Sequence, residues 1–201
     1  MGTTGPKLEF WYDFASTYSY LSAMRIEALA EAAGIAVAWK PFLLGPIFGA
    51  QGWATSPFNL YPAKGRNMVR DIERIAAERG LPFALPAKFP QNSLTAARLA
   101  LVGGEEGWLP TFTRAVYAAE FGHGVDISDK TALATLLRSL DVDSERLFAR
   151  IEQPDLKQRL KDQTIEAQAR GIYGAPSFLV GDELFWGDDR LDRAVAWAKG
   201  R

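Results

Sequence analysis

A serine stands where a predicted strand runs into a predicted helix, in residues 12–17 (YDFAST). A helix begins with backbone N–H groups that lack an intrahelical partner and with the positive end of its dipole, so this junction favours an anion. The Ser16 hydroxyl has two interpretations. It caps the helix, which contributes about 1 kcal/mol, or it donates a hydrogen bond to a bound thiolate and lowers the pKa of that thiol. The chain has no cysteine, so the thiol would have to come with a ligand.

A third interpretation makes Ser16 itself a nucleophile. A nucleophilic serine needs a neighbouring base, and the one histidine of the chain, His123, lies in a Gly-His-Gly sequence. Nothing in the spacing of these residues favours a Ser-His-Asp triad over a solvated loop histidine.

A second candidate segment is residues 171–177 (GIYGAPS), where a proline follows a glycine-rich turn and opens a predicted strand. This position is typical of a cis-proline, which leaves the preceding residue with free backbone groups. Ala175 could then pair with a peptide-like ligand by adding a short strand, with Pro176 bending the chain. The alternative is an ordinary turn between a loop and a strand.

The third candidate segment is residues 186–190 (WGDDR), just before the last predicted helix. Asp188 or Asp189 either caps that helix or holds the ammonium group of a ligand. A helix N-terminus beside it could hold a carboxylate, and together they would suit the α-amino acid end of a γ-glutamyl group.

Aromatic and polar residues in the middle of the chain are candidates for an acceptor pocket. Lys64 is either a cation for a ligand carboxylate or an exposed helix lysine. Asn59, five residues earlier, is a polar candidate for the same region. The other candidates for the wall of the pocket are Phe48, Trp53, Phe58, Phe89 and Asn92.

The elements that position these residues follow from periodicity. Residues 7–14 read as a buried strand, residues 18–33 as an amphipathic helix that stops at Gly34, and residues 35–42 as a second strand. A strand, a helix and a strand of these lengths form a βαβ unit with a right-handed crossover.

The pattern then becomes helical. Residues 48–59 read as an ordered loop, and residues 81–92, with three prolines, as an extended irregular segment. The predicted helices are 62–79, 93–102, 109–120, 130–139, 144–151 and 155–170.

The end of the chain returns to strands. Residues 176–180 and 183–186 are predicted strands joined by a tight Gly181-Asp182 turn, and residues 190–199 form a closing helix. The first and last parts together resemble one thioredoxin-like sheet. The predicted fold is therefore α/β, with a thioredoxin-like domain (1–47 and 171–201) interrupted by an all-helical insertion (48–170) that roofs Ser16.

Composition excludes several classes of protein. With 201 residues and 48% hydrophobic content, the chain can bury a core. A net charge of -1 indicates neither a nucleic-acid nor a membrane partner, and no apolar run is long enough to span a bilayer. The lack of cysteine excludes disulfides, thiolate metal sites and a Cys-x-x-Cys redox centre, and no metal is expected. Residues 1–7 lack the features of a signal peptide, which predicts a cytoplasmic enzyme.

Three segments together resemble one family. Residues 13–21 (DFASTYSYL) are similar to the pattern D-F-x-S-P-[YF]-S-Y-L, residues 171–178 to a cis-proline segment, and residues 185–191 (FWGDDRL) to W-G-[NS]-D-R-L. These motifs, in this order, resemble those of the kappa-class glutathione transferase and 2-hydroxychromene-2-carboxylate isomerase family, which has a DsbA-like thioredoxin fold. The resemblance covers nearly the whole chain.

The resemblance implies glutathione as cofactor. Ser16 would bind and activate its sulfur, the backbone of Ala175 before cis-Pro176 would pair with its cysteinyl part, and the segment Trp186, Gly187, Asp188 and Asp189 would receive its γ-glutamyl end. Lys64 corresponds to a lysine near the glycyl carboxylate, and Asn59 to a polar residue on the substrate side, whereas Phe89 and Asn92 are candidates for the substrate pocket from the sequence pattern. The chain departs from the family at Thr17, which replaces a proline, at Ala175, which is smaller than usual, and in the loop 45–59.

The implied activity is glutathione-dependent isomerisation of an unsaturated 2-oxo acid from aromatic catabolism, by reversible addition of the thiolate. The implied partners are this small-molecule substrate and a second copy of the chain. The alternatives are a kappa-like glutathione transferase and a non-redox DsbA-like protein that binds peptides along the Ala175–Pro176 edge.

Overall fold

A mixed four-stranded sheet lies at the centre of the computed structural model, which describes residues 7–200. The strand order is β2-β1-β3-β4, with β1 parallel to β2 and antiparallel to β3. The strands are β1 (Lys7–Tyr12), β2 (Ala36–Pro41), β3 (Ser177–Val180) and β4 (Glu183–Trp186). The signal-peptide prediction falls almost wholly on residues 1–6, outside the described residues.

The central strand β1 is buried on both faces, which explains why its sequence does not alternate cleanly. On one face Phe10 stacks on Phe178, with ring centroids 5.5 Å apart, and meets Trp39 edge-on at 5.1 Å. On the other face Trp11 packs against Phe42 in a separate smaller cluster. The aromatic residues of this strand are therefore core residues, and they fix the position of the strand end that leads to Ser16.

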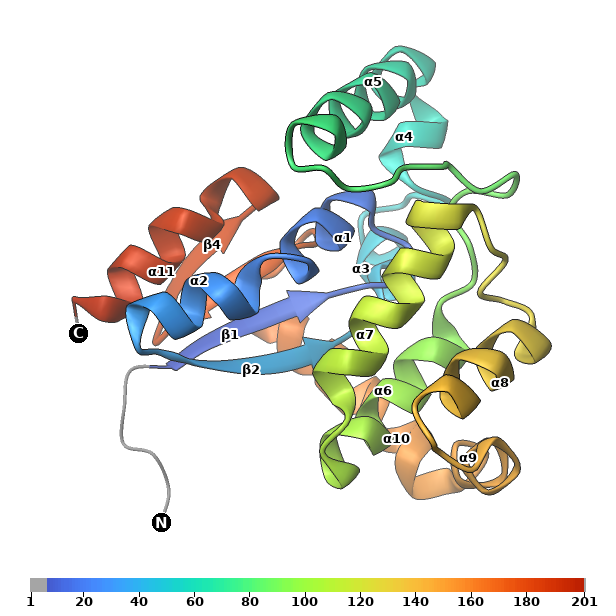
Figure 1. The fold of residues 1–201 in the computed structure, drawn as a ribbon. Helices are drawn as coiled ribbons and strands as arrows, with labels where there is room; N and C mark the ends of the chain where they lie inside the picture. Colours follow the sequence, from blue (N-terminus) through green and yellow to red (C-terminus); the bar gives the residue numbers. More distant parts are fainter. Residues whose placement is uncertain (1–6, 201) are drawn as a thin grey trace.

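Helices cover both faces of the sheet (Figure 1). Helices α2 (Ile26–Ala33) and α11 (Leu191–Lys199) contribute to the larger core cluster with Phe10, whereas α3 (Leu44–Ala50) and α10 (Pro154–Ala169) supply residues to the smaller cluster around Trp11. The order βαβ, helices, ββα is confirmed, and with it the thioredoxin-like fold.

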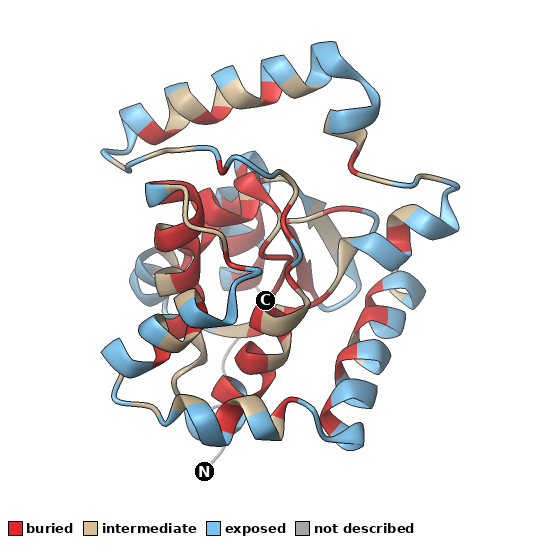
Figure 2. Cartoon of the chain, turned by 90° about the vertical axis from the view of Figure 1, so that its right-hand side faces the viewer, coloured by how far each residue is buried: buried red, intermediate tan, exposed pale blue. Residues whose placement is uncertain are grey.

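Most of the remaining helices gather beside the sheet, while α4 and α5 stand apart above the end of β1 (Figures 1 and 2). The outer side of α5 is exposed, and its inner side carries the buried Met68, Ile72 and Ala76. The remaining helical elements are α1 (Thr17–Ala23), α4 (Pro57–Leu60), α5 (Pro62–Glu78), α6 (Leu94–Glu106), α7 (Leu109–Tyr117), the π-helical turn Ala118–Gly122, α8 (Lys130–Ser139), α9 (Ser144–Arg150) and the 3-10 turn Asp188–Arg190.

The predicted single helix 18–33 was wrong, because the chain breaks at Met24 and Arg25 into α1 and α2. Arg25 leaves helical geometry at φ -130°, and its guanidinium bonds to the side chain and the backbone oxygen of Asp188. This tertiary contact coincides with the break, and no proline or glycine marks it in the sequence.

The predicted loop 48–59 was also wrong in part, because it contains the end of α3 and the short helix α4. The Asp13 carboxylate accepts a hydrogen bond from the N–H of Leu44 at 2.7 Å, which caps α3 from a distant part of the sequence. Pro46 then stands in the first helical turn, where a missing N–H costs nothing.

Helix α6 runs four residues beyond its predicted end at Val102, to Glu106. Gly103 is needed inside this helix, because a Cβ there would lie 2.7 Å from the ring of Trp108. The division into a 1–47 and 171–201 domain and a 48–170 insertion stays a prediction, since α6 and α10 pack directly on β2. Within residues 7–200 no helix has the length and apolarity to cross a membrane.

The π-helical turn buries Glu120 completely, and neither of its carboxylate oxygens has a hydrogen-bond partner among the described residues. Burial, reinforced by the negative charges of Asp13 and Asp126, raises the pKa of Glu120 well above its usual 4.5. The unfolded chain therefore loses this proton at lower pH than the folded chain does, so ionisation favours unfolding and stability falls as the pH rises above about 4.5.

We expect Glu120→Gln to remove this pH dependence. In urea titrations, its free energy of unfolding should exceed that of the wild type at pH 8 by more than it does at pH 4. Glu31→Gln, which changes an exposed carboxylate on α2, is the matched control. An equal difference in the free energy of unfolding at both pH values would contradict the raised pKa of Glu120.

Candidate active site

Ser16 stands at the N-terminus of α1, and its hydroxyl makes two hydrogen bonds. Its Oγ accepts from the backbone N–H of Ser19 at 3.2 Å and donates to the backbone oxygen of Ala175 at 2.9 Å. The capping role is thus confirmed, and the serine is only 8% exposed. The same contact joins the strand–helix junction to the segment before Pro176, 159 residues later in the chain.

Asp13 holds this junction in place, a role that the sequence did not reveal. Its buried carboxylate accepts hydrogen bonds from the N–H groups of Ala15 (3.0 Å) and Leu44 (2.7 Å). Its backbone oxygen accepts from the N–H of Ser16 and from the hydroxyl of Tyr117. Burial raises the pKa of Asp13, and these hydrogen bonds oppose the rise. Asp13 therefore fixes both the turn before Ser16 and the start of α3.

The peptide bond between Ala175 and Pro176 is cis. The backbone oxygen of Pro176 accepts a hydrogen bond from the N–H of Gly187 at 3.0 Å, so the two predicted ligand-binding segments are joined. Gly174 must be a glycine, because a Cβ there would lie 2.4 Å from the indole nitrogen of Trp186. The N–H of Ala175 has no partner among the described residues, whereas its carbonyl is occupied by Ser16.

A cavity of about 1140 Å³ opens in front of Ser16. It brings together nearly all the candidate residues predicted from the sequence. Its walls include Ser16, Lys64, Phe89, Asn92, Ala175, Pro176, Trp186, Gly187, Asp188 and Asp189, together with Phe48, Trp53 and Phe58. The rings of Phe48 and Trp53 lie 5.7 Å apart and form part of an aromatic wall. A space of this size exceeds what a tripeptide thiol needs, so a second molecule can enter.

Asp188 is buried (3% exposed) and is the centre of an ion-pair cluster rather than a helix cap. Its Oδ1 accepts from the hydroxyl of Ser22 at 2.8 Å and lies 3.4 Å from Nε of Arg25, and its Oδ2 accepts from Arg79 at 2.7 Å. Helix α11 begins after Arg190 with no side-chain cap. The prediction that Asp188 or Asp189 caps the last helix was therefore wrong.

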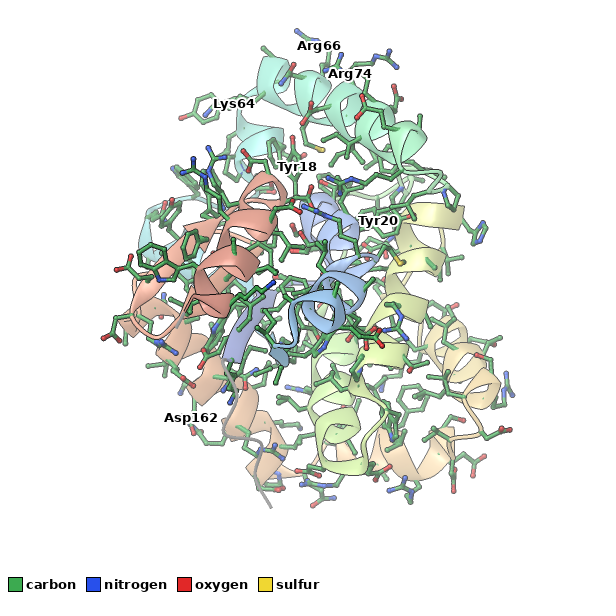
Figure 3. All side chains as sticks on the ribbon, turned by 60° about the vertical axis from the view of Figure 1, so that its left-hand side comes forward. Tyr18, Tyr20, Lys64, Arg66, Arg74 and Asp162 are labelled. Atoms are coloured by element: carbon green, nitrogen blue, oxygen red, sulfur yellow. The ribbon has the colours of Figure 1, made fainter. Side chains whose placement is uncertain are left out.

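Lys64 lies at the N-terminal end of α5, with its ammonium group 5.1 Å from the centre of the Tyr61 ring (Figure 3). Asn59, in contrast, is not among the residues that line the cavity. Its amide nitrogen donates to the backbone oxygen of Phe89 at 3.1 Å and ties α4 to the segment 81–92. The contact of Asn59 with the substrate stays a prediction. His123 is exposed and does not line the cavity, so it gives Ser16 no base.

Several residues of the cavity wall were missed by the sequence analysis, among them Arg79, Tyr18 and Tyr173. In the sequence, Arg79 reads as an ordinary residue at the end of a helix, just before Gly80, with no sign that it lines the cavity. Tyr18 donates to Asp71 on α5 at 2.8 Å, and Tyr173 packs against Trp186 with tilted rings whose centroids are 5.0 Å apart. Burial, together with Asp71, raises the pKa of Tyr18. The contact between Tyr18 and Asp71 could not be found without knowing how α5 lies over α1.

Comparisons with known proteins give one family. A family model described as a DSBA-like thioredoxin domain matches residues 7–196. The 2-hydroxychromene-2-carboxylate isomerase of Sphingobium xenophagum is 30% identical over 92% of this chain and 94% of its own. Glutathione S-transferase kappa 2 of Caenorhabditis elegans is 25% identical over 94% of this chain and 89% of its own. A solved 2-hydroxychromene-2-carboxylate isomerase superposes with a TM-score of 0.87 at 26% identity, covering 97% of this chain and 95% of that one.

Proposed function

Because the chain belongs to the DsbA-like thioredoxin family, with 2-hydroxychromene-2-carboxylate isomerases and kappa-class glutathione transferases among its relatives, we propose that it is a glutathione-dependent isomerase. Its substrate in this proposal is an unsaturated 2-oxo acid derived from an aromatic compound. The similarity to the 2-hydroxychromene-2-carboxylate isomerases supports isomerisation as the reaction class, and the similarity to the kappa-class glutathione transferases supports glutathione as the thiol.

One observation carries the proposal: the Ser16 hydroxyl lines the cavity and donates to the backbone oxygen of Ala175, whose own N–H has no partner among the described residues. The cysteinyl residue of glutathione, laid along Ala175, would accept a hydrogen bond from this N–H and donate its own to the Ala175 oxygen. The Ser16 hydroxyl would then lose its present acceptor and turn to the cysteinyl sulfur. Glutathione binding thus frees the donor that stabilises its own thiolate.

Ser16 and the first turn of α1 lower the pKa of the bound thiol, because they interact with the thiolate and not with the thiol. Lys64 receives the glycyl carboxylate, and the segment Trp186 to Asp189 receives the γ-glutamyl end.

Bound glutathione would supply a thiolate that adds reversibly to the carbon β to the substrate carbonyl, so that the former double bond can rotate before the thiol is eliminated and returns unchanged. The part of the chain itself would be to hold the sulfur beside Ser16 and the first turn of α1, and to keep the substrate against the aromatic wall.

The aromatic wall supports an acceptor of this kind. Phe48, Trp53, Phe58 and Phe89 offer apolar surface for the aromatic part of the substrate, and Asn92 can hydrogen-bond its polar end. Two parts of the account stay predictions: a cytoplasmic location and a homodimer.

We expect the amount of free glutathione to stay constant while substrate converts. The measurement is proton NMR with glutathione at one tenth of the substrate concentration: an isomerase completes many turnovers and leaves the thiol signal intact. A kappa-like transferase, the second candidate on the evidence of the relatives, would stop after one equivalent and accumulate a thioether. Full conversion without any glutathione would contradict both.

A further inference from the structure

Arg79, at the C-terminal end of α5, faces the cavity with most of its donors unused. One of the terminal nitrogens of its guanidinium bonds to Asp188 at 2.7 Å, and the other two guanidinium nitrogens have no partner among the described residues. Its side chain is 29% exposed and forms part of the cavity wall. A guanidinium carries five N–H donors in a planar fork, so one carboxylate partner leaves room for a second.

Asp188 is buried and already accepts from Ser22, Arg25 and Arg79, so it is a poorer acceptor for a ligand's ammonium group than an exposed carboxylate would be. The neighbouring Asp189 differs. Its carboxylate is 72% exposed and pairs with Arg190, itself 52% exposed, at the surface. The γ-glutamyl end of the cavity therefore presents one accessible anion, Asp189, and one cation with free donors, Arg79. This is the complement of an α-amino acid, which carries an ammonium and a carboxylate on one carbon.

Helix α5 places cations at both ends of the cavity. Lys64, Asp71, Ile75 and Arg79 all line it, at spacings that keep them on one helical face. Asp71, between the two cations, is held by Tyr18 and by Arg74. The 15 positions from Lys64 to Arg79 span about 22 Å at the α-helical rise, and an extended tripeptide spans about 10–12 Å. Two long side chains leaning inward can cover the difference.

We propose that Arg79 binds the α-carboxylate of the γ-glutamyl residue while Lys64 binds the glycyl carboxylate, so that α5 holds glutathione at both ends. This inference rests on the proposed use of glutathione and assigns a ligand contact to a residue outside the three family motifs. Asp188 is then a positioning residue: it orients the Arg79 guanidinium and ties it to Arg25. Asp189 receives the ammonium group.

The test is calorimetric titration with two probes, glutathione and 4-aminobutanoyl-cysteinylglycine, which is glutathione without its α-carboxylate. We expect the wild type to bind glutathione about 10- to 100-fold more tightly than the analogue, as one charge-assisted contact implies. In Arg79→Gln this ratio should fall to about one, with the affinity for the analogue unchanged. Arg79→Lys should keep part of the ratio.

Two controls separate the outcomes. Arg66→Gln removes an exposed cation from the same helix (Figure 3) and should leave both affinities unchanged. Lys64→Gln should weaken both probes by the same factor, because both keep the glycyl carboxylate. A wild-type ratio near one, or an undiminished ratio in Arg79→Gln, would overturn the inference and leave the proposed function standing. A wild type that binds no glutathione would overturn both.

Discussion

Ser16→Ala should lower kcat/KM for isomerisation by about 10²-fold or more. The lost hydroxyl is the side-chain donor that the proposal places at the sulfur of glutathione, and removing such a donor from a developing anion costs about 2.7–4 kcal/mol at the transition state. The pKa of the bound thiol should rise toward its value in solution, which is measured from thiolate absorbance against pH.

The structure shows that the same substitution also removes a helix cap and the contact with Ala175. Ser16→Ala should therefore destabilise the fold by about 1 kcal/mol. Ser16→Gly is the matched variant, because glycine is a tolerated N-cap that still lacks the hydroxyl. Both variants should lose the rate, and only alanine should lose the stability. A fully active glycine variant would refute the role of the hydroxyl.

Asp188→Ala should lower the free energy of unfolding by about 2–4 kcal/mol, because it leaves the Arg79 guanidinium and the buried Ser22 hydroxyl without their acceptor and removes one of the acceptors of Arg25. The arginines are partly exposed and can regain water, which keeps the loss below that of a fully buried pair. Denaturant titration measures the effect. The KM for glutathione should rise as well, with kcat much less affected, because Arg79 loses its orientation.

The matched control is Asp192→Ala. This carboxylate also pairs with Arg25, at 2.7 Å, but it is 64% exposed. Its removal should change stability by less than about 1 kcal/mol, as for other surface ion pairs. Equal losses of stability from the two variants would mean that the buried ion pairs of Asp188 contribute no more than a surface ion pair does.

The fold could be predicted from the sequence where the signal was local. Gly34 and Gly80 ended their helices as expected, each with a positive φ, and the two-residue turn at Gly181 and Asp182 joined the last strands. The errors arose where a distant residue decides the local conformation. Helix α3 begins where Asp13 caps it, and helix 18–33 breaks where Arg25 reaches Asp188.

The candidate site divides in the same way. Ser16, Ala175 and Trp186 were identified because their motifs have a definite pattern, and the cavity brings them together. Arg79 was missed because its role depends on the path of α5 over α1, which no short motif specifies. Asn59 was assigned to the substrate side through the family resemblance. Its amide bonds to the backbone oxygen of Phe89, and its contact with the substrate stays a prediction.

The central claim is that this protein, which has no cysteine, positions the sulfur of glutathione beside the hydroxyl of Ser16. A crystal structure of the complex with glutathione tests it most directly. We expect the sulfur within hydrogen-bonding distance of Ser16 Oγ, and the cysteinyl backbone paired with Ala175 in place of the present bond between Ser16 and Ala175. A sulfur bound elsewhere in the cavity, with Ser16 still donating to Ala175, would contradict the account.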